Sequence, residues 1–310
     1  MFERVLVASD FSKHSEQIIH CVGEIPGIKE VTLLNVLYKS EIGRTWSPGD
    51  DLKKANAQFE KPKKELESLG LKVKAKAVES GDSPEYKMIE KIADEEKADL
   101  VVMGARGRSL FRGFVLGSVS TNVLRHGTHN LLIMRYKTLD DGDMEKYCPM
   151  MFSKVLCPVD FSEAGMAAIN LIKDIQQPIS VHLLSVIGKG ETAAEVDARM
   201  KDAQQKLEAL KSDLLAKVKI NVTSEVISAE AGYKTYGTGG MASSKGVATP
   251  VIEGVEGIII QKAEEIDASM IALSSAGKGM LDEATVGSVV FDVARRATRP
   301  VLIARSEKKA

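Results

Sequence analysis

The sequence predicts an α/β protein built from two doubly wound domains, each with a five-stranded parallel sheet. Short apolar runs alternate along the chain with longer amphipathic runs, a pattern typical of parallel strands joined by crossover helices. The chain also repeats this pattern, and its 310 residues suffice for two domains that each bury a core. Both observations indicate two copies of one α/β domain.

The repeat is visible in matching segments. Residues 2–12 return as 152–162, and 31–36 return as 181–186, both at an offset of 150. Residues 98–135 return as 268–305, at an offset of 170. A repeat of this length is a duplicated domain and not a solenoid, and the difference between the offsets places twenty extra residues in the second copy.

The expected strands are rich in Val, Leu and Ile at successive positions, as in sheets that helices cover on both faces. In the first half, we expect strands near residues 3–9, 30–36, 71–78, 99–103 and 130–135, and helices near 12–24, 50–69, 83–97 and 117–126. The second half repeats this plan, with strands near 153–159, 179–186, 219–227, 269–273 and 300–305.

Two segments interrupt the repeated pattern. The first contains Asp140-Asp141-Gly142-Asp143 without apolar periodicity, so we expect a first domain at residues 1–137, a linker at 138–151 and a second domain at 152–308. The other, at about 229–250, mixes five glycines with Ser, Thr and Tyr. Such a glycine content predicts a long loop, which serves either as a lid or partner contact or as an inert surface excursion.

Composition excludes several classes of protein. The net charge of −1 and the interspersed signs offer no basic stripe for nucleic acid. No apolar run approaches the roughly 20 residues of a membrane-spanning helix, and the first residues lead directly into a strand and not a signal peptide, so we expect a cytoplasmic protein. Three cysteines without CxxC spacing and five scattered histidines predict neither disulfides nor a zinc site.

The most informative motif is Gly104-Ala105-Arg106-Gly107, nine further residues, and then Gly117-Ser118. Glycines let the backbone pass close to phosphates, and a helix with its N-cap at Ser118 would offer the amides of residues 118–120 to phosphate oxygens. Arg106, Arg108 and Arg112 lie between the landmarks with no acidic residue among them. The motif therefore predicts a nucleotide site, here a di- or triphosphate site.

A plainer interpretation stays open for each residue. The glycines serve only the turn if no ligand binds, and a serine at a helix start is often only a cap. The motif is neither a P-loop nor a Rossmann fingerprint, which would follow the first strand. Asp10 ends the first strand, and it either caps the next helix or contacts the nucleotide or its metal ion at the crevice between neighbouring strands.

Together with the Asp10-Phe11-Ser12 turn and the closing strand Leu131-Leu132-Ile133-Met134, the glycine motif resembles the universal stress protein family, and it does so in both halves. The resemblance implies an adenine nucleotide alpha hydrolase-like sheet in the strand order 3-2-1-4-5 and, in members with the full motif, bound ATP. By position it assigns nucleotide contacts to Ala8, Asp10, Val36, Gly104, Arg106, Gly107, Arg108, Gly117, Ser118, Val119 and Ser120. The family also dimerises, often through its last strand, which implies an intramolecular pseudo-dimer of residues 130–135 with 299–305 and leaves a further homodimer open.

The second half departs from the pattern. The positions that match are Pro158, Asp160, Val186, Gly277, Gly287 and Ser288, but Ser274 replaces the first glycine. Lys278, Asp282 and Glu283 replace the three arginines, so the local charge falls from +3 to −1. Each close pair of like charges costs about 1 kcal/mol in water, and serine adds about 1 kcal/mol if the turn needs a positive φ. We therefore expect one strong site in the first half and a weak or vacant second site.

The sequence predicts an ATP-binding, stress-related regulatory protein whose nucleotide stabilises a conformation recognised by an unknown protein partner. Two alternatives stay open. One is a slow ATPase or adenylyl-transferring enzyme that uses Asp10 with Mg²⁺, although no other carboxylate lies near the motif in sequence. The other is a scaffold or chaperone-like module that needs no nucleotide.

Overall fold

The computed structural model describes residues 2–37, 48–105, 116–138, 144–145, 150–175, 180–188, 192–229, 235–236, 254–277 and 286–306. The strands of the first half are β1 (Arg4–Ala8), β2 (Glu30–Leu37), β3 (Lys72–Glu79), β4 (Leu100–Gly104) and β5 (Asn130–Met134). Those of the second half are β8 (Lys154–Pro158), β9 (Ser180–Ile187), β10 (Asn221–Ser228), β12 (Met270–Ser274) and β13 (Val301–Ala304). Every predicted strand is present, with its ends within two residues of the predicted ones.

These strands form one continuous sheet in the order β11-β10-β9-β8-β12-β13-β5-β4-β1-β2-β3. Among the five predicted strands of each half the pairing is parallel and follows the order 3-2-1-4-5, which confirms the predicted fold class. The winding therefore reverses between β1 and β4 in the first half and between β8 and β12 in the second. In sheets of this type, ligands bind beyond the carboxyl ends of the strands at such a reversal.

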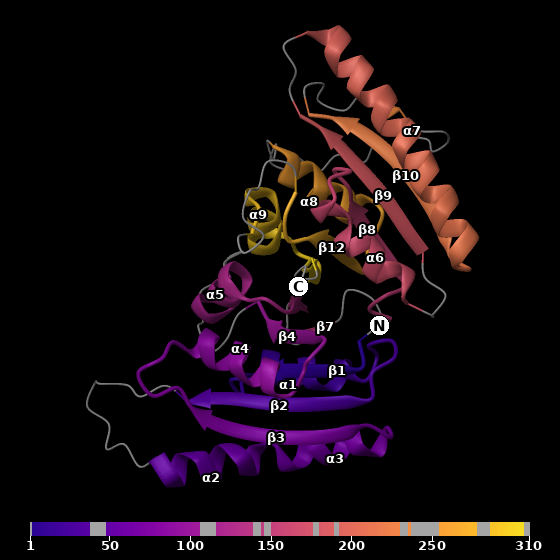
Figure 1. The fold of residues 1–310 in the computed structure, drawn as a ribbon. Coiled ribbons are helices and arrows are strands. Elements are labelled where there is room, and N and C mark those ends of the chain that lie inside the picture. Colours follow the sequence, from indigo (N-terminus) through magenta and orange to yellow (C-terminus); the bar gives the residue numbers. More distant parts are fainter. Residues whose placement is uncertain are drawn as a thin grey trace.

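Helices cover both faces of the sheet. One face is covered by α1 (Lys13–Val22), α3 (Glu60–Ser68), α6 (Ala167–Lys173) and α7 (Ala193–Lys217). The other is covered by α4 (Glu85–Glu95), α5 (Ser118–His126), α8 (Val255–Glu265) and α9 (Ser288–Arg296). Alternate residues of a strand enter opposite cores: Val5 and Val7 pack under α1, whereas Leu6 packs toward α4 and α5. Figure 1 shows the two halves, with α7 along β9 and β10 at one end and α2 (Pro48–Gln58) and α3 along β3 at the other.

The two halves meet through their fifth strands, as the resemblance implies. β5 and β13 pair antiparallel, with Leu132 opposite Leu302. Two arginines at equivalent positions reach across this junction to the last turn of the opposite helix. Arg135 donates from Nη2 to the carbonyls of Ala294 (2.6 Å) and Arg295 (3.1 Å), and Arg305 donates to Leu124 (2.6 Å). Each arginine therefore satisfies carbonyls that a helix end leaves without an intrahelical donor.

Replacing Arg135 by methionine is expected to lower the free energy of unfolding by about 2 kcal/mol, because buried carbonyls of α9 lose a charged donor. Arg125→Met is the control at the same junction, since its guanidinium is exposed and only lies over the Phe291 ring at 4.5 Å. That variant should cost less than about 1 kcal/mol. Urea denaturation measures both, and equal effects would contradict the role given to Arg135.

Three expectations about the connections are corrected. The predicted helix at 50–69 is two helices, α2 and α3, because Pro62 has no amide to donate to the carbonyl of Gln58, where α2 ends. The predicted linker contains β7 (Met144–Glu145), which pairs with β6 (Lys137–Thr138) at the boundary between the predicted first domain and the linker. The glycine-rich insertion contributes β11 (Thr235–Tyr236), which pairs antiparallel with β10. Residues 230–234 and 237–253, which make up most of the insertion, lie outside the described part of the chain.

Candidate functional site

In both halves, the last long helix starts beside the end of the fourth strand. The Gly117 amide donates to the Ala105 carbonyl at 2.8 Å, and the Gly287 amide donates to the Ser275 carbonyl at 2.9 Å. In each half the loop between the two bonded residues therefore begins and ends at the same place. That place is the carboxyl end of β4 in the first half and of β12 in the second. Arg106, Gly107 and Arg108 belong to that loop and lie outside the described residues.

The start of α5 differs by one residue from the prediction. The N-cap is Gly117, which makes no side-chain capping bond, and Ser118 is the first helical residue. Thr121 is the first residue whose amide donates to a carbonyl of this turn, that of Gly117 at 2.8 Å. The amides of residues 118–120 precede that ladder, so they are available in principle to an anion at the helix start. The hydroxyl of Ser120 donates to the Gly104 carbonyl at 2.8 Å and so fastens the helix to β4.

Asp10 organises the turn that follows β1. Its Oδ1 accepts from the Ser12 amide at 3.0 Å, and the cap of α1 is Ser12 itself, which accepts from the Ser15 amide. Phe11 between them has a φ of 59°, a left-handed conformation that costs a bulky residue energy. Of the two roles considered for Asp10, capping α1 directly is therefore wrong, because Asp10 holds the turn that precedes the cap.

The remaining first-half positions lie at one edge of the sheet. Ala8 ends β1 and is paired with Leu34 on one side and Met103 on the other. Val36 follows Leu34 by two residues on β2, and Gly104 follows Met103 on β4. Ala8, Val36, Gly104 and the start of α5 therefore surround the point where the winding of the sheet reverses. The structure brings together the described residues that the sequence selected.

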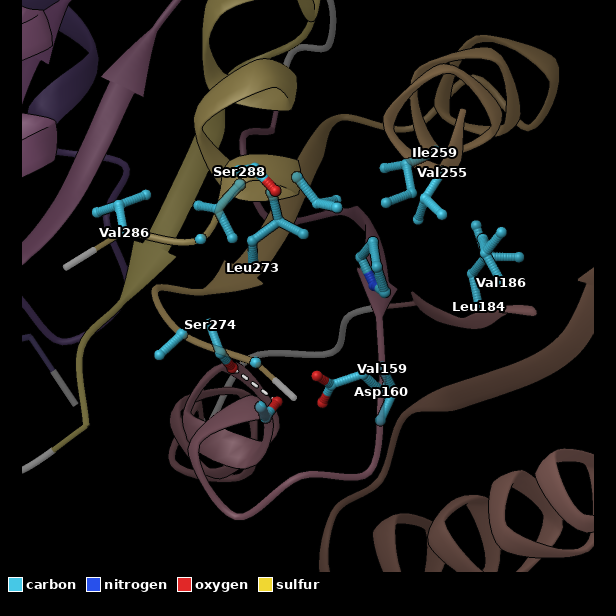
Figure 2. Close-up of a pocket in the computed structure, with 17 residues that line it drawn as sticks. Val159, Asp160, Leu184, Val186, Val255, Ile259, Leu273, Ser274, Val286 and Ser288 are labelled. Carbon is cyan, nitrogen blue, oxygen red and sulfur yellow. Dashed lines mark hydrogen bonds between the residues drawn. The ribbon is translucent and has the colours of Figure 1, made fainter. Parts of the chain in front are cut away.

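The equivalent edge of the second half encloses a cavity of about 400 Å³ (Figure 2). All six residues assigned to the second site line it: Pro158, Asp160, Val186, Gly277, Gly287 and Ser288. Most of the remaining wall is aliphatic and comes from β9, β12, α8 and α9. It consists of Val159, Gly165, Leu184, Val255, Ile259, Leu273, Ser274, Ala276, Val286, Val289 and Val290.

Ser274, the residue in place of Gly104, acts differently from the expectation. Ser274 is not among the described non-glycine residues that have a positive φ. The energetic cost expected for a serine in a positive-φ turn therefore does not apply. Its hydroxyl instead accepts from the Ala168 amide at 3.0 Å and donates to the Gly165 carbonyl at 2.7 Å. Ser274 therefore ties the start of α6 to the end of β12, as the dashed line in Figure 2 shows for Gly165.

The turn after β8 also differs from its counterpart. Asp160 accepts from the amide and the hydroxyl of Ser162, at 3.0 and 2.7 Å, and Phe161 has a φ of 61°. Gly165 stands where the first half has Ser15. A Cβ at Gly165 would lie 2.0 Å from Asp160 Oδ1, so a side chain there would displace the carboxylate. Gly165 itself lies in a 3₁₀ turn, Ala164–Met166, which precedes α6.

The family model described as the universal stress protein family matches this chain twice, at residues 1–135 and 151–305. The chain belongs to the universal stress protein family. The two matches show that the chain holds two copies of the family's fold in tandem, as the repeat predicted. Within the family, the chain is 31% identical over 160 residues to universal stress protein MJ0577 of Methanocaldococcus jannaschii. That match covers 44% of this chain and 97% of the relative.

Solved structures agree on the fold over the whole length. A universal stress protein from Archaeoglobus fulgidus superposes with a TM-score of 0.66 at 22% identity, covering 99% of this chain and 97% of that chain. A protein of unknown function from Pseudomonas aeruginosa PAO1 superposes with a TM-score of 0.60 at 14% identity, covering 98% and 92%. Both are similarities of fold, and both extend over the two halves of the chain.

Three further features of the described segments bear on function. No helix in them combines the length and the apolar character needed to cross a lipid bilayer. Within the same segments, no three His, Cys, Asp or Glu residues gather as a metal site would require. Cys21 and Cys157 are both buried and form no disulfide with each other, and burial raises the pKa of the Cys157 thiol to about 12. That thiol therefore stays protonated and unreactive at neutral pH.

Proposed function

We propose that the first half binds ATP and that the bound nucleotide makes this chain a regulatory, stress-related protein. One observation carries the proposal: the bond from Gly117 to Ala105 fixes the start of α5 at the reversal of the sheet, beside β1 and β4. A helix start at that place presents amides and the positive end of the helix dipole to a phosphate. The sequence adds Arg106, Arg108 and Arg112 to the adjoining loop.

The residues at this edge suit binding better than catalysis. Asp10 already holds the Ser12 amide, so its carboxylate is positioned by the turn. Mg²⁺ commonly binds through one or two carboxylates together with phosphate oxygens, and Asp10 is the residue that would take part if ATP binds with Mg²⁺. Phosphoryl transfer also needs a positioned acceptor or water. We therefore infer that ATP acts as a ligand whose presence a protein partner reads.

The second half is proposed to bind ATP weakly or not at all. The segment between Ser274 and Gly287 carries a net charge of −1, whereas the equivalent segment between Gly104 and Gly117 carries +3. Val290 also replaces Ser120 in the first turn of the helix, and it lines the cavity with methyl groups. The second copy of the fold therefore has a cavity at this edge of the sheet but lacks the positive charge that the first copy carries in the adjoining sequence.

Releasing the ligand from the purified protein tests the proposal. After denaturation, the supernatant should contain an adenine nucleotide, at no more than about one equivalent per chain. Protein that releases none and also binds no added ATP would refute ATP binding. If bound ATP is converted to product in the native protein but not in Asp10→Ala, the chain is instead a slow ATPase.

A further inference from the structure

The cavity of the second half faces the start of α9, whose first residues line it: Gly287, Ser288, Val289 and Val290. Gly287 is the N-cap and makes no side-chain capping bond. The first amide to donate within the helix is that of Phe291, to the Gly287 carbonyl at 2.9 Å. The amides of residues 288–290 therefore precede the ladder, and the Ser288 hydroxyl adds a donor beside them. These donors and the positive end of the helix dipole favour an anion in this part of the cavity.

The other polar side chains of the lining are engaged by the protein itself. Asp160 accepts from the amide and the hydroxyl of Ser162, at 3.0 and 2.7 Å, and takes part in a further interaction. The Ser274 hydroxyl is bonded to the start of α6. Figure 2 shows Ser288 on the side of α9 and Asp160 across the cavity from it. Among the side chains and helix-start amides of this lining, the groups left for a ligand are therefore donors, and the ligand must bring the acceptor.

The rest of the wall is aliphatic. Its side chains come from β9, α8 and β12 and include Leu184, Val186, Val255, Ile259 and Leu273 (Figure 2). A cavity of about 400 Å³ lies in the range of small-molecule sites, and a wall of this kind favours the burial of an apolar body. The cavity therefore suits an amphiphile, with its charged end at α9 and its body against the aliphatic wall.

The cavity favours a ligand of small charge. Its described lining contains no lysine, arginine or histidine, so an anion there meets only amides, a hydroxyl and the helix dipole. That dipole is equivalent to roughly half a positive charge. The Asp160 carboxylate belongs to the same lining, and Asp282 and Glu283 follow in the adjoining sequence, so each further negative charge on the ligand meets like charges. The single charge of a carboxylate is thus favoured over the several charges of a triphosphate.

We propose that the second cavity binds a small carboxylate with an apolar body. Ser288 and the amides at the start of α9 hold the carboxylate, and the aliphatic wall holds the body. This inference concerns the second cavity alone and does not depend on ATP binding in the first half. The two copies of the fold then recognise two classes of anion, a triphosphate in the first half and a singly charged amphiphile in the second.

Methyl NMR of the full-length protein at pH 7 tests the proposal. Ile259 lines the cavity, so its δ1 methyl group reports on ligands there. The probes are octanoate, octan-1-ol, which has as many carbon atoms but no charge, and acetate, which has the charge without the body. We expect octanoate to shift the Ile259 signal at concentrations about tenfold or more below those of octan-1-ol. Each methylene group removed from octanoate should weaken binding by about three- to fourfold, so acetate should have no effect at concentrations where octanoate saturates.

Variants at the helix start test what holds the carboxylate. Ser288→Pro removes one amide and the hydroxyl, and the φ of −61° and ψ of 147° at Gly287 suit a residue that precedes proline. Octanoate should then bind about tenfold more weakly, whereas octan-1-ol should bind as before, which shows that the cavity is intact. Ser288→Ala removes the hydroxyl alone and should cause a smaller loss. The matched variant Ser118→Pro should leave the response of Ile259 to octanoate unchanged.

Three results would overturn the proposal. If octan-1-ol shifts Ile259 as readily as octanoate does, the helix start holds no anion and the cavity is only an apolar site. If ATP or AMP shifts Ile259 at lower concentrations than octanoate, the cavity is a phosphate site. If octanoate at millimolar concentration leaves Ile259 unmoved, the cavity does not take ligands of this class. Calorimetric titration with ATP tests the first half separately, so failure of one proposal is distinguishable from failure of the other.

Discussion

Replacing Ser118 by proline is expected to weaken ATP binding by about 10- to 100-fold while α5 stays folded. Ser118 is the first residue of the helix, where proline fits because its fixed φ suits a helix start. Gly117 before it has φ −64° and ψ 158°, a conformation that a residue preceding proline adopts readily. The substitution thus removes one amide donor from the helix start, and a bond to a charged group contributes about 1.5–3 kcal/mol. Calorimetric titration with ATP measures the loss.

Two control variants distinguish the loss of the Ser118 amide from other effects of the proline substitution. Ser118→Ala removes the hydroxyl but keeps the amide, so ATP affinity should change little. Ser288→Pro makes the same change in the second half, where Gly287 has φ −61° and ψ 147°, and should leave the tight site intact. If Ser118→Pro binds ATP as tightly as the unaltered protein, main-chain amides do not hold the phosphates.

The largest stability effect is expected at Lys262. Its side chain is only 4% exposed, and its Nζ lies 3.0 Å from Glu225 Oε2 and 2.9 Å from Glu265 Oε2. Burial alone would lower the pKa of Lys262, but its hydrogen bonds with the two glutamates raise it. Lys262→Met would leave the Glu225 carboxylate, itself only 13% exposed, without its main cation. The free energy of unfolding should fall by about 3 kcal/mol, as measured by urea denaturation at pH 7.

A double variant and a change of pH identify the cause. Glu225→Gln in the Lys262→Met background removes the uncompensated charge, so it should restore more than half of the loss. His182, whose Nε2 lies 3.5 Å from Glu225 Oε2, and after it Lys262 hold the pKa of Glu225 below its ordinary value of 4.5. A lowered pKa stabilises the folded state above pH 4.5, and that contribution disappears as the pH falls through the folded-state pKa. The deficit of Lys262→Met should therefore shrink on acidification, and a constant deficit would indicate lost packing instead.

The fold was predictable because its signals are local and repeated. Runs such as Leu100–Met103 and Leu131–Met134 are apolar at every position, the pattern typical of a strand that helices cover on both faces. The duplication located each element twice, and the resemblance supplied the strand order, which periodicity alone does not give. Pro62 was visible in the sequence, but the amphipathic pattern continues across it, so the break between α2 and α3 was missed.

The site was predictable as a set of positions but less so in its details. The sequence placed Asp160, Val186 and Ser288 together, and the structure gathers them around one cavity. It could not show that the Ser274 hydroxyl bonds to Gly165, because that contact joins residues more than a hundred positions apart. The charged cluster of Lys262, Glu225 and His182 was also missed, because it forms only when α8 packs on β9 and β10.

Calorimetric titration of the full chain with ATP tests the central claim most directly. The first half is proposed to hold the triphosphate with the amides at the start of α5 and with the neighbouring arginines, whereas the second half lacks the positive charge. The titration should therefore give one tight site per chain, and Ser118→Pro should abolish or weaken that site while Ser288→Pro preserves it. Two equally tight sites, or a single site that only Ser288→Pro weakens, would contradict the account.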